Sequence, residues 1–287
     1  MRYVMIVTDS TCNLPSHLVS GLSLVVIPIY IIVRGRTFRD GIDISPEQVL
    51  ELLARGEYPQ FSQPAPGDFM KAYRRVREFA DPSCPRLSVV SIHVTAQLSG
   101  TYNAATLAAA GCSEIDILVV DSGTGSMATG WVALEAARAA AAGADRDSII
   151  RLVRSAIDRT AIFVLIPDLT FLHRAGRLGK AQAWLGANLS LNPIVTARRG
   201  VLAPYRLVRG RKRGLEMLVK AAVDKIGKGA AVRAAVVHVA AEGDARTVMG
   251  AVRDNFCVHE EMILHAAASV TAGLGPGAVA LCLLKEG

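Results

Sequence analysis

Residues Ser99-Gly100-Thr101 form a small, hydroxylated turn that could recognise an anion. Before it, Leu87 to Val94 are apolar and largely β-branched, which predicts a strand buried on both faces. After it, residues 102–110 are rich in alanine and favour a helix. A helix that begins here presents unpaired backbone N–H groups, which bind anions, and Thr95 and Ser99 would add hydroxyl donors. The alternative is that Ser99 only caps the helix.

Acidic and hydroxylated residues also follow two other predicted strands. Residues 3–7 read as a strand that leads to Asp9-Ser10, and residues 115–120 read as a strand that leads to Asp121-Ser122. Strands alternate with helices up to about residue 159, which predicts a mostly parallel, doubly wound sheet. Ligands bind beyond the carboxyl ends of strands in such sheets, so we expect these polar residues to line one crevice.

The pattern changes in the second half of the chain. Residues 193–197 and 202–208 read as a hairpin, and two late strands flank Gly273-Leu274-Gly275-Pro276-Gly277. We therefore expect an N-terminal α/β domain over residues 1–159 and a C-terminal α+β domain over residues 160–287. Other expected elements are a strand over 25–33, a helix over 46–54 capped by Ser45, a helix over 66–79, a helix capped by Asp147 or Ser148, and an apolar helix over 182–189.

Composition narrows the class of protein. Of the 287 residues 51% are hydrophobic and 20% are charged, which predicts a large folded core. A net charge of +7 suits an anionic ligand, but 5% aromatic residues and no recognised module argue against a nucleic-acid partner. The five cysteines lack a C-x-x-C pair, and the six histidines lack H-E-x-x-H spacing, so neither a disulfide framework nor a metal site is expected. With no signal peptide predicted, we expect a soluble, cytoplasmic protein.

The scattered turns form an ordered set over nearly the whole chain. They are VTDST-x-NLP (7–15), RDGIDIS (39–45), SQP (62–64), LSGTYNAA (98–105), VVDS (119–122), L-x-x-AGR (172–177), LVRGRK (207–212) and GPGAVA (275–280). This set resembles the DegV family, the fatty-acid-binding proteins that serve as lipid-carrying subunits of bacterial fatty acid kinase. The resemblance implies a two-domain DegV-like fold with a fatty acid between the domains. It also implies a protein that is not itself catalytic, because a separate kinase phosphorylates the bound carboxylate.

The resemblance also implies roles for particular residues. It places hydroxyl donors for the carboxylate at Ser62 and Thr95, and its motifs carry Arg177 near the ligand and Arg209 as a candidate contact for the kinase. The other basic residues between 206 and 213 are expected to form a solvated face. No cofactor or metal is implied besides the bound fatty acid, and contact with a membrane would be transient at most.

Physical chemistry agrees with a lipid ligand. A sixteen-carbon chain buries on the order of fifteen methylenes at roughly 0.8 kcal/mol each, about 12 kcal/mol before association costs. The carboxylate needs donors that replace its hydration. Hydroxyl donors suit an acid that must later react, because a tight bidentate arginine would compete with phosphorylation. Candidate lining residues are Ala183, Trp184, Leu185, Leu189 and Ile194, all of which could instead be ordinary core.

Three positions depart from the family pattern. Phe61 replaces a threonine before the SQP serine, Thr95 replaces a serine and is followed by Ala96, and Gly273 replaces a histidine. If that histidine helps phosphoryl transfer, this chain would bind lipid without being an efficient kinase subunit. A histidine introduced at position 273 is then expected to raise acyl-phosphate formation.

Two enzyme classes compete with the lipid carrier. Residues 123–128 match G-x-G-x-x-A between a strand and a helix, so a nucleotide-dependent oxidoreductase is the alternative function. The acidic ribose partner expected about twenty residues further on is not evident. A hydrolase that uses Ser99 or Ser122 is no better supported, because neither lies in G-x-S-x-G.

Overall fold

Three sheets organise the part of the protein that the structure describes. The computed structural model describes residues 2–80, 86–178, 181, 191–198 and 200–287. The strands are β1 (Arg2–Asp9), β2 (Leu24–Ile27), β3 (Tyr30–Val33), β4 (Arg36–Arg39), β5 (Gln60–Ser62), β6 (Arg86–His93), β7 (Asp116–Asp121), β8 (Thr160–Leu165), β9 (Leu191–Arg198), β10 (Val201–Arg209), β11 (Ala231–His238), β12 (Cys257–His265) and β13 (Val279–Lys285). The helices are the 3-10 helix η1 (Ser10–Cys12), α1 (Ser16–Val19), α2 (Pro46–Ala54), α3 (Pro66–Arg74), α4 (Val76–Phe79), α5 (Thr101–Ala110), α6 (Ser126–Ala141), α7 (Arg146–Arg159), α8 (Thr170–Arg174), α9 (Arg211–Ile226), α10 (Glu242–Asn255) and α11 (Ala268–Leu274).

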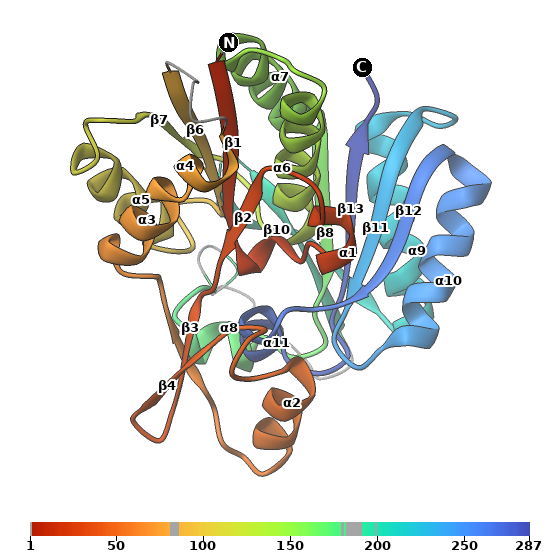
Figure 1. Cartoon of the computed structure of the whole chain (residues 1–287). Helices are drawn as coiled ribbons and strands as arrows, with labels where there is room; N and C mark the ends of the chain where they lie inside the picture. Colours follow the sequence, from red (N-terminus) through yellow and green to blue (C-terminus); the bar gives the residue numbers. More distant parts are fainter. Residues whose placement is uncertain (1, 81–85, 179–180, 182–190, 199) are drawn as a thin grey trace.

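The N-terminal sheet is parallel, as predicted. Its order is β2-β1-β6-β7, and every neighbouring pair runs in the same direction. Asp121 lies opposite His93 in the register, and Asp9 ends the adjacent strand, so the two Asp-Ser strand ends share one edge of the sheet. A small antiparallel sheet, β4-β3-β5, extends below this edge (Figure 1).

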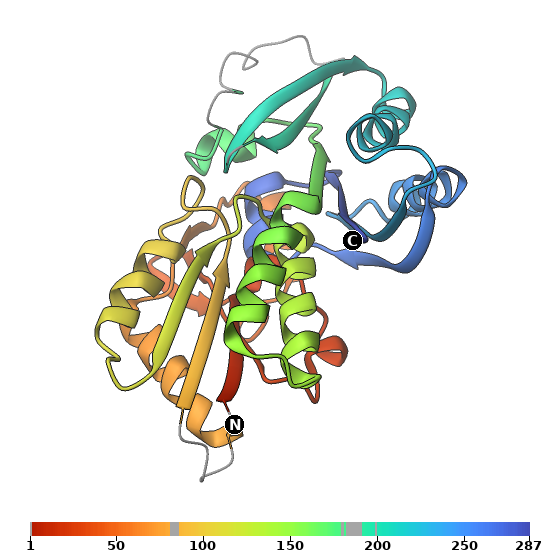
Figure 2. The ribbon, with the colours of Figure 1, turned by 90° about the horizontal axis from the view of Figure 1, so that it is seen from above.

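The C-terminal sheet is mixed, as expected for an α+β half. Its order is β10-β9-β8-β13-β11-β12, with β11 and β12 parallel and the other pairs antiparallel. The predicted hairpin is β9–β10, which turns at Gly200 with φ of +79°. Figure 2 shows most of the N-terminal half (red to light green) on one side of the molecule and most of the C-terminal half (cyan to blue) on the other.

Helix α6 lies between the parallel sheet and the mixed sheet (Figure 1). Trp131 on this helix is fully buried, and its indole N–H donates to the Cys282 carbonyl of β13 at 3.3 Å. One hydrophobic cluster contains residues of β1, β6, α6, β8 and β13. The boundary at residue 159 stays a prediction, since residues on both sides of it share this core.

Several expected elements differ from the observed ones. The strand expected over 25–33 is two strands, β2 and β3, separated at Pro28, which has no N–H for a ladder bond. The helix expected over 66–79 is α3 and α4, which meet at Arg75. Asp145 rather than Asp147 or Ser148 caps α7, because its carboxylate accepts the Ser148 N–H at 2.7 Å. The capping of α2 by Ser45 is confirmed, whereas residues 182–189 lie outside the described residues.

Two helical glycines give opposite predictions for stability. A Cβ at Gly130 in α6 would lie 2.5 Å from the Cys12 carbonyl oxygen, whereas a Cβ at Gly250 in α10 meets nothing within 4 Å. Gly130→Ala should therefore lower the free energy of unfolding by about 1–3 kcal/mol, since overpacking outweighs the gain in helix propensity. Gly250→Ala, the control, should raise it by up to about 1 kcal/mol. Urea denaturation measures both, and equal effects would contradict the close approach of α6 to η1.

Candidate functional site

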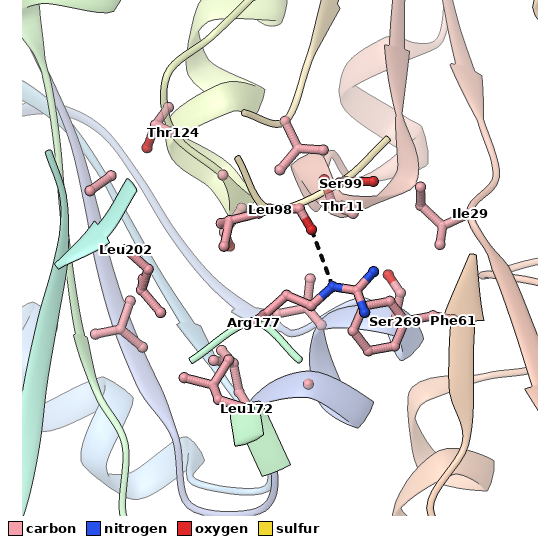
Figure 3. A pocket seen from close by; sticks show the side chains of 18 of the residues that line it. Thr11, Ile29, Phe61, Leu98, Ser99, Thr124, Leu172, Arg177, Leu202 and Ser269 are labelled. Carbon is pink, nitrogen blue, oxygen red and sulfur yellow. Dashed lines mark hydrogen bonds between the residues drawn. The ribbon is translucent and has the colours of Figure 1, made fainter. Parts of the chain in front are cut away.

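An apolar cavity of about 160 Å³ lies at the carboxyl edge of the parallel sheet, where it faces the mixed sheet. The N-terminal half contributes residues that follow β1, β6 and β7, including Thr11, Leu98 and Thr124 (Figure 3). The C-terminal half contributes residues of β8, β9, β10, α8, α11 and β13. A crevice beyond the strand ends is therefore present, but Asp9, Ser10, Asp121 and Ser122 are not among its lining residues.

The wall formed by the mixed sheet is apolar because of the alternation along its strands. Ile162 and Val164 of β8 line the cavity, while Phe163 between them packs into a separate cluster on the other face. Ala197 of β9 and Leu202 of β10 lie opposite each other in the register and continue this wall. An alkyl chain could lie against this surface without meeting a charged group.

The guanidinium of Arg177 lines the cavity apart from this apolar wall. Leu202 and Thr124 lie on one side of Arg177 in Figure 3, and Ser99 and Ser269 lie on the other. Arg177 follows α8, and its Nε donates to the Leu98 carbonyl at 3.2 Å, which joins the two halves of the chain. Its Nη1 donates to the Ala175 carbonyl, and Arg177 makes no ion pair with any described residue. Burial lowers the pKa of this guanidinium, and an anionic partner would offset that cost.

Phe61 and Gly273 are in contact although 212 positions separate them in the chain. A Cβ at Gly273 would lie 3.6 Å from the Cζ atom of Phe61, so the Phe61 ring occupies the space beside that glycine. The guanidinium of Arg177 lies over the same ring, with Cζ 4.7 Å from the centroid. Two of the three departures from the family pattern, Phe61 and Gly273, are thus neighbours in the cavity wall.

Most of the predicted ligand-binding residues meet at this cavity. Ser62, Ser99, Arg177 and Gly273 line it. Gly273, which was expected between the two late strands, lies near the C-terminal end of α11. Gly100 is not among the lining residues. It packs against Gln63, which does line the cavity, and a Cβ at Gly100 would come within 3.0 Å of the Gln63 side chain.

Thr95 is buried but does not line the cavity. The chain bends at residue 94, and the Thr95 hydroxyl accepts the Gln97 N–H at 3.4 Å. A Cβ at Gly200 would lie 2.6 Å from the Thr95 Oγ1, so this hydroxyl faces the β9–β10 turn. The geometry therefore differs from the expectation that Thr95 donates to the ligand.

The hydroxyl groups around the cavity differ in their availability. Thr11 donates to Asp9, and Ser269 donates to Asp40 at 2.5 Å, so both hydroxyl protons are already used. Ser99 is not the N-cap of α5, a position that Gly100 holds, although its Oγ contacts the Thr101 hydroxyl at 2.7 Å. Among the described residues, the Ser62 hydroxyl makes a single long contact, with the Gln63 carbonyl at 3.4 Å. Ser62 and Arg177 are therefore the donors most available for a hydrogen bond to a ligand.

Helix α11, which was not predicted from the sequence, also contributes to the cavity. Ser269, Val270 and Leu274 line the cavity, and the alanine-rich segment before the late glycines was the signal for this helix. Asp40 fixes α11 in place, because it accepts the Ala268 N–H at 2.9 Å as well as the Ser269 hydroxyl. Burial raises the pKa of the Asp40 carboxyl.

A buried relay has the order of a hydrolase triad. Ser91 Oγ lies 2.6 Å from His93 Nε2, and His93 Nδ1 lies 3.0 Å from Asp9 Oδ2. All three side chains are fully buried and none lines the cavity, so a substrate cannot reach Ser91. Asp9 also accepts the backbone N–H of Thr11, which lines the cavity. The Ser91–His93–Asp9 chain of hydrogen bonds therefore supports the cavity wall from behind.

The glycine-rich turn at 123–128 joins β7 to α6 but is not part of a dinucleotide-binding unit. β7 is the edge strand of the parallel sheet, and the chain continues through α6 and α7 into β8 of the other sheet. The fingerprint requires a βαβ unit in one sheet. Thr124, Gly125 and Ser126 line the apolar cavity instead. The oxidoreductase alternative has no support in this geometry.

Ile194 and Arg209 do not line the cavity. Ile194 packs on the opposite face of the mixed sheet, beside Leu165, and not in the cavity. Ala183, Trp184, Leu185 and Leu189 lie outside the described residues. Arg209 is exposed at the end of β10.

Membrane spans and metal sites are two further classes of feature to consider in the part of the chain that the structure describes. No helix there combines the length and the apolar character that a membrane span requires. No group of three or more His, Cys, Asp or Glu residues in the described ranges could hold a metal ion.

The fold and the cavity define an α/β protein of two main sheets with an apolar cavity where they face each other. A family model described as "Uncharacterised protein, DegV family" matches residues 3–286. The chain belongs to the DegV family. A DegV domain-containing protein of Deinococcus radiodurans is 33% identical over 287 residues, which cover 98% of each chain.

Solved structures agree with this assignment. A DegV family protein from Thermus thermophilus, described as fatty acid binding, superposes with a TM-score of 0.91 at 29% identity and covers 99% of this chain and 100% of its own. DegV from Bacillus subtilis, described as a fatty acid binding protein, gives a TM-score of 0.87 at 27% identity with 99% of each chain covered. These relatives share the two-sheet fold described above.

Proposed function

We propose that this chain binds a long-chain fatty acid in the apolar cavity and presents its carboxylate to a separate kinase. The observation that carries the proposal is a half-buried guanidinium without a described carboxylate partner, at one side of an apolar cavity. Arg177 and Ser62 would bind the carboxylate, and Ile162, Val164 and Leu202 would contact the chain. The fatty acid binding ascribed to the relatives from Thermus thermophilus and Bacillus subtilis supports this assignment.

The volume of the cavity indicates where the chain would extend. About 160 Å³ is close to the volume of an engineered cavity that binds benzene, so a long chain needs further room. Thr124, Ile162 and Ala197 also line a neighbouring cavity of about 680 Å³. Its lining combines apolar side chains such as Phe163 and Ala221 with the charged residues Asp158, Asp224 and Lys225. The tail would therefore pass Ala197, on the side of the cavity away from Ser99 and Ser269.

The chemistry itself would belong to the kinase. A carboxylate oxygen would attack the terminal phosphorus of a nucleoside triphosphate, and the nucleoside diphosphate would leave as the acyl phosphate forms. This chain would act in the cytoplasm as a non-catalytic carrier that excludes water from the tail and fixes the head group. Exposed Arg209 would contact the kinase.

Native mass spectrometry of the purified protein tests lipid binding. The expected result is a bound mass equal to a fatty acid, lost on delipidation and regained on titration with hexadecanoate. A protein that neither retains nor rebinds an acyl chain would contradict the proposal. Hydroxylamine trapping of the acyl phosphate, formed with a bacterial fatty acid kinase and ATP, tests the kinase step separately.

The contact between Phe61 and Gly273 changes what is expected of a histidine at position 273. Gly273→His alone should not raise acyl-phosphate formation, because the Phe61 ring occupies the space beside residue 273. The double variant Phe61→Thr/Gly273→His should raise it several-fold over the wild type. Trapped hydroxamate measures both rates. A gain in the single variant that equals the gain in the double variant would show that the Phe61 ring is no obstacle.

A further inference from the structure

A second cavity lies on the other side of Phe61 and Arg177. This outer cavity has a volume of about 500 Å³, and its lining includes Tyr58, Phe171 and Arg174 in addition to Phe61 and Arg177. The same Phe61 and Arg177 side chains line the apolar cavity. The two cavities therefore share a wall, and a ligand that passes this wall would place its head group beside Arg174.

Arg174 is held in position without being neutralised. Its Cζ atom lies 3.8 Å from the centroid of the Tyr58 ring, and the Tyr58 ring lies 6.0 Å from that of Phe171. Phe171 packs directly on Gly275, where a Cβ would come within 2.2 Å of the ring. Stacking occupies the face of the guanidinium and leaves its N–H donors at the edge. Arg174 makes no ion pair with any residue that the structure describes.

The charges around the outer cavity suit a dianion. Two guanidinium groups line it, Arg174 and Arg177, and no Asp or Glu is among its described lining residues. A phosphate monoester carries about −1.5 to −2 charges at pH 7, and arginine binds phosphate oxygens through paired hydrogen bonds. A carboxylate needs one such partner, and its phosphorylated form needs more.

We propose that the outer cavity is a second subsite, which binds the phosphate group of an acyl phosphate whose chain occupies the apolar cavity. The proposal rests on the function proposed above. Arg177 contacts the head group in both forms, whereas Arg174 contacts only the phosphate. Arg174 therefore favours retention of the phosphorylated lipid over the free acid.

The test compares two ligands that have the same tail. Isothermal titration measures the affinities of hexadecanoate and hexadecyl phosphate, a stable stand-in for the acyl phosphate, for the wild type and for Arg174→Gln. The substitution should reduce the affinity for hexadecyl phosphate about tenfold and the affinity for hexadecanoate less than twofold. Arg174→Lys keeps the charge but not the planar donors, and it should give an intermediate loss. Equal losses for the two ligands, or no loss for the phosphate, would overturn the proposal.

Two controls test whether the loss of affinity is specific to Arg174 and to a phosphate that is linked to a lipid tail. Arg206→Gln removes the same charge from an exposed arginine outside this cavity, and it should leave both affinities within twofold. Inorganic phosphate should bind far more weakly than hexadecyl phosphate, since the tail supplies most of the affinity. If inorganic phosphate binds as tightly, the site serves the free ion and the lipid-linked subsite is wrong. A wild type that does not bind hexadecanoate would instead refute the proposed function.

Discussion

Replacing Arg177 with glutamine is expected to weaken hexadecanoate binding by roughly 10- to 100-fold, because hydrogen bonds to charged groups contribute about 1.5–3 kcal/mol. Binding of hexadecanol, which has the same tail and no charge, should change less than threefold. The comparison of acid with alcohol isolates the head group, since both ligands use the same apolar wall. Fluorescence displacement or isothermal titration gives both dissociation constants.

The matched control for Arg177 is Ser62→Ala, which removes the second available donor but no charge. It should reduce the affinity for hexadecanoate by a smaller factor, about fivefold, as expected for the loss of one neutral hydrogen bond of about 1 kcal/mol. Thr95→Ala should have little effect on either ligand, because its hydroxyl faces Gly200 rather than the cavity. If Thr95→Ala weakened the acid more than Arg177→Gln did, the carboxylate would lie nearer β6 than we propose.

Replacing Ala197 with phenylalanine is expected to reduce hexadecanoate affinity by about 100-fold or more. Ala197 lines both the apolar cavity and the neighbouring 680 Å³ cavity, so a ring there blocks the path of the tail. Displacing about four methylenes at roughly 0.8 kcal/mol each costs about 3 kcal/mol. Titration with acids of increasing length measures the loss, which should grow with chain length up to the blocked position.

Two observations keep the Ala197 prediction specific. Ala54→Phe, a substitution at an exposed position on α2, should leave binding unchanged. Hexanoate should bind Ala197→Phe and the wild type within threefold, because a short chain does not reach residue 197. A loss that is equal for short and long acids would place the tail elsewhere.

Local sequence patterns were sufficient to predict much of the fold. Apolar runs alternating with helical segments predicted the parallel sheet, and the closely spaced runs 193–197 and 202–208 predicted the β9–β10 hairpin, because both signals lie within a few residues. The same patterns left open whether Ile194 lines the cavity or belongs to the core, where the structure places it. A strand directs neighbouring residues to opposite faces, and the apolar character of Ile194 does not reveal which face adjoins the cavity.

The site was predictable only in part. Ser62, Ser99, Arg177 and Gly273 lie in recognisable motifs and meet at the cavity. The role of Phe61 arises from contacts with Gly273 and Arg177 that are distant in the chain, and no local rule reports such contacts. Thr95 lies in the same motif but does not line the cavity, since its hydroxyl, after the bend that follows β6, faces Gly200.

Helix α6 limits how a lipid can enter. Ten of its residues are buried, and its tryptophan reaches a strand of the opposite sheet, so hinged opening of the two halves would expose a large part of the shared interior. That motion would be as costly as partial unfolding. Exchange of cargo should therefore depend on swinging of individual rings and loops at the rim, with the scaffold staying rigid throughout the delivery cycle.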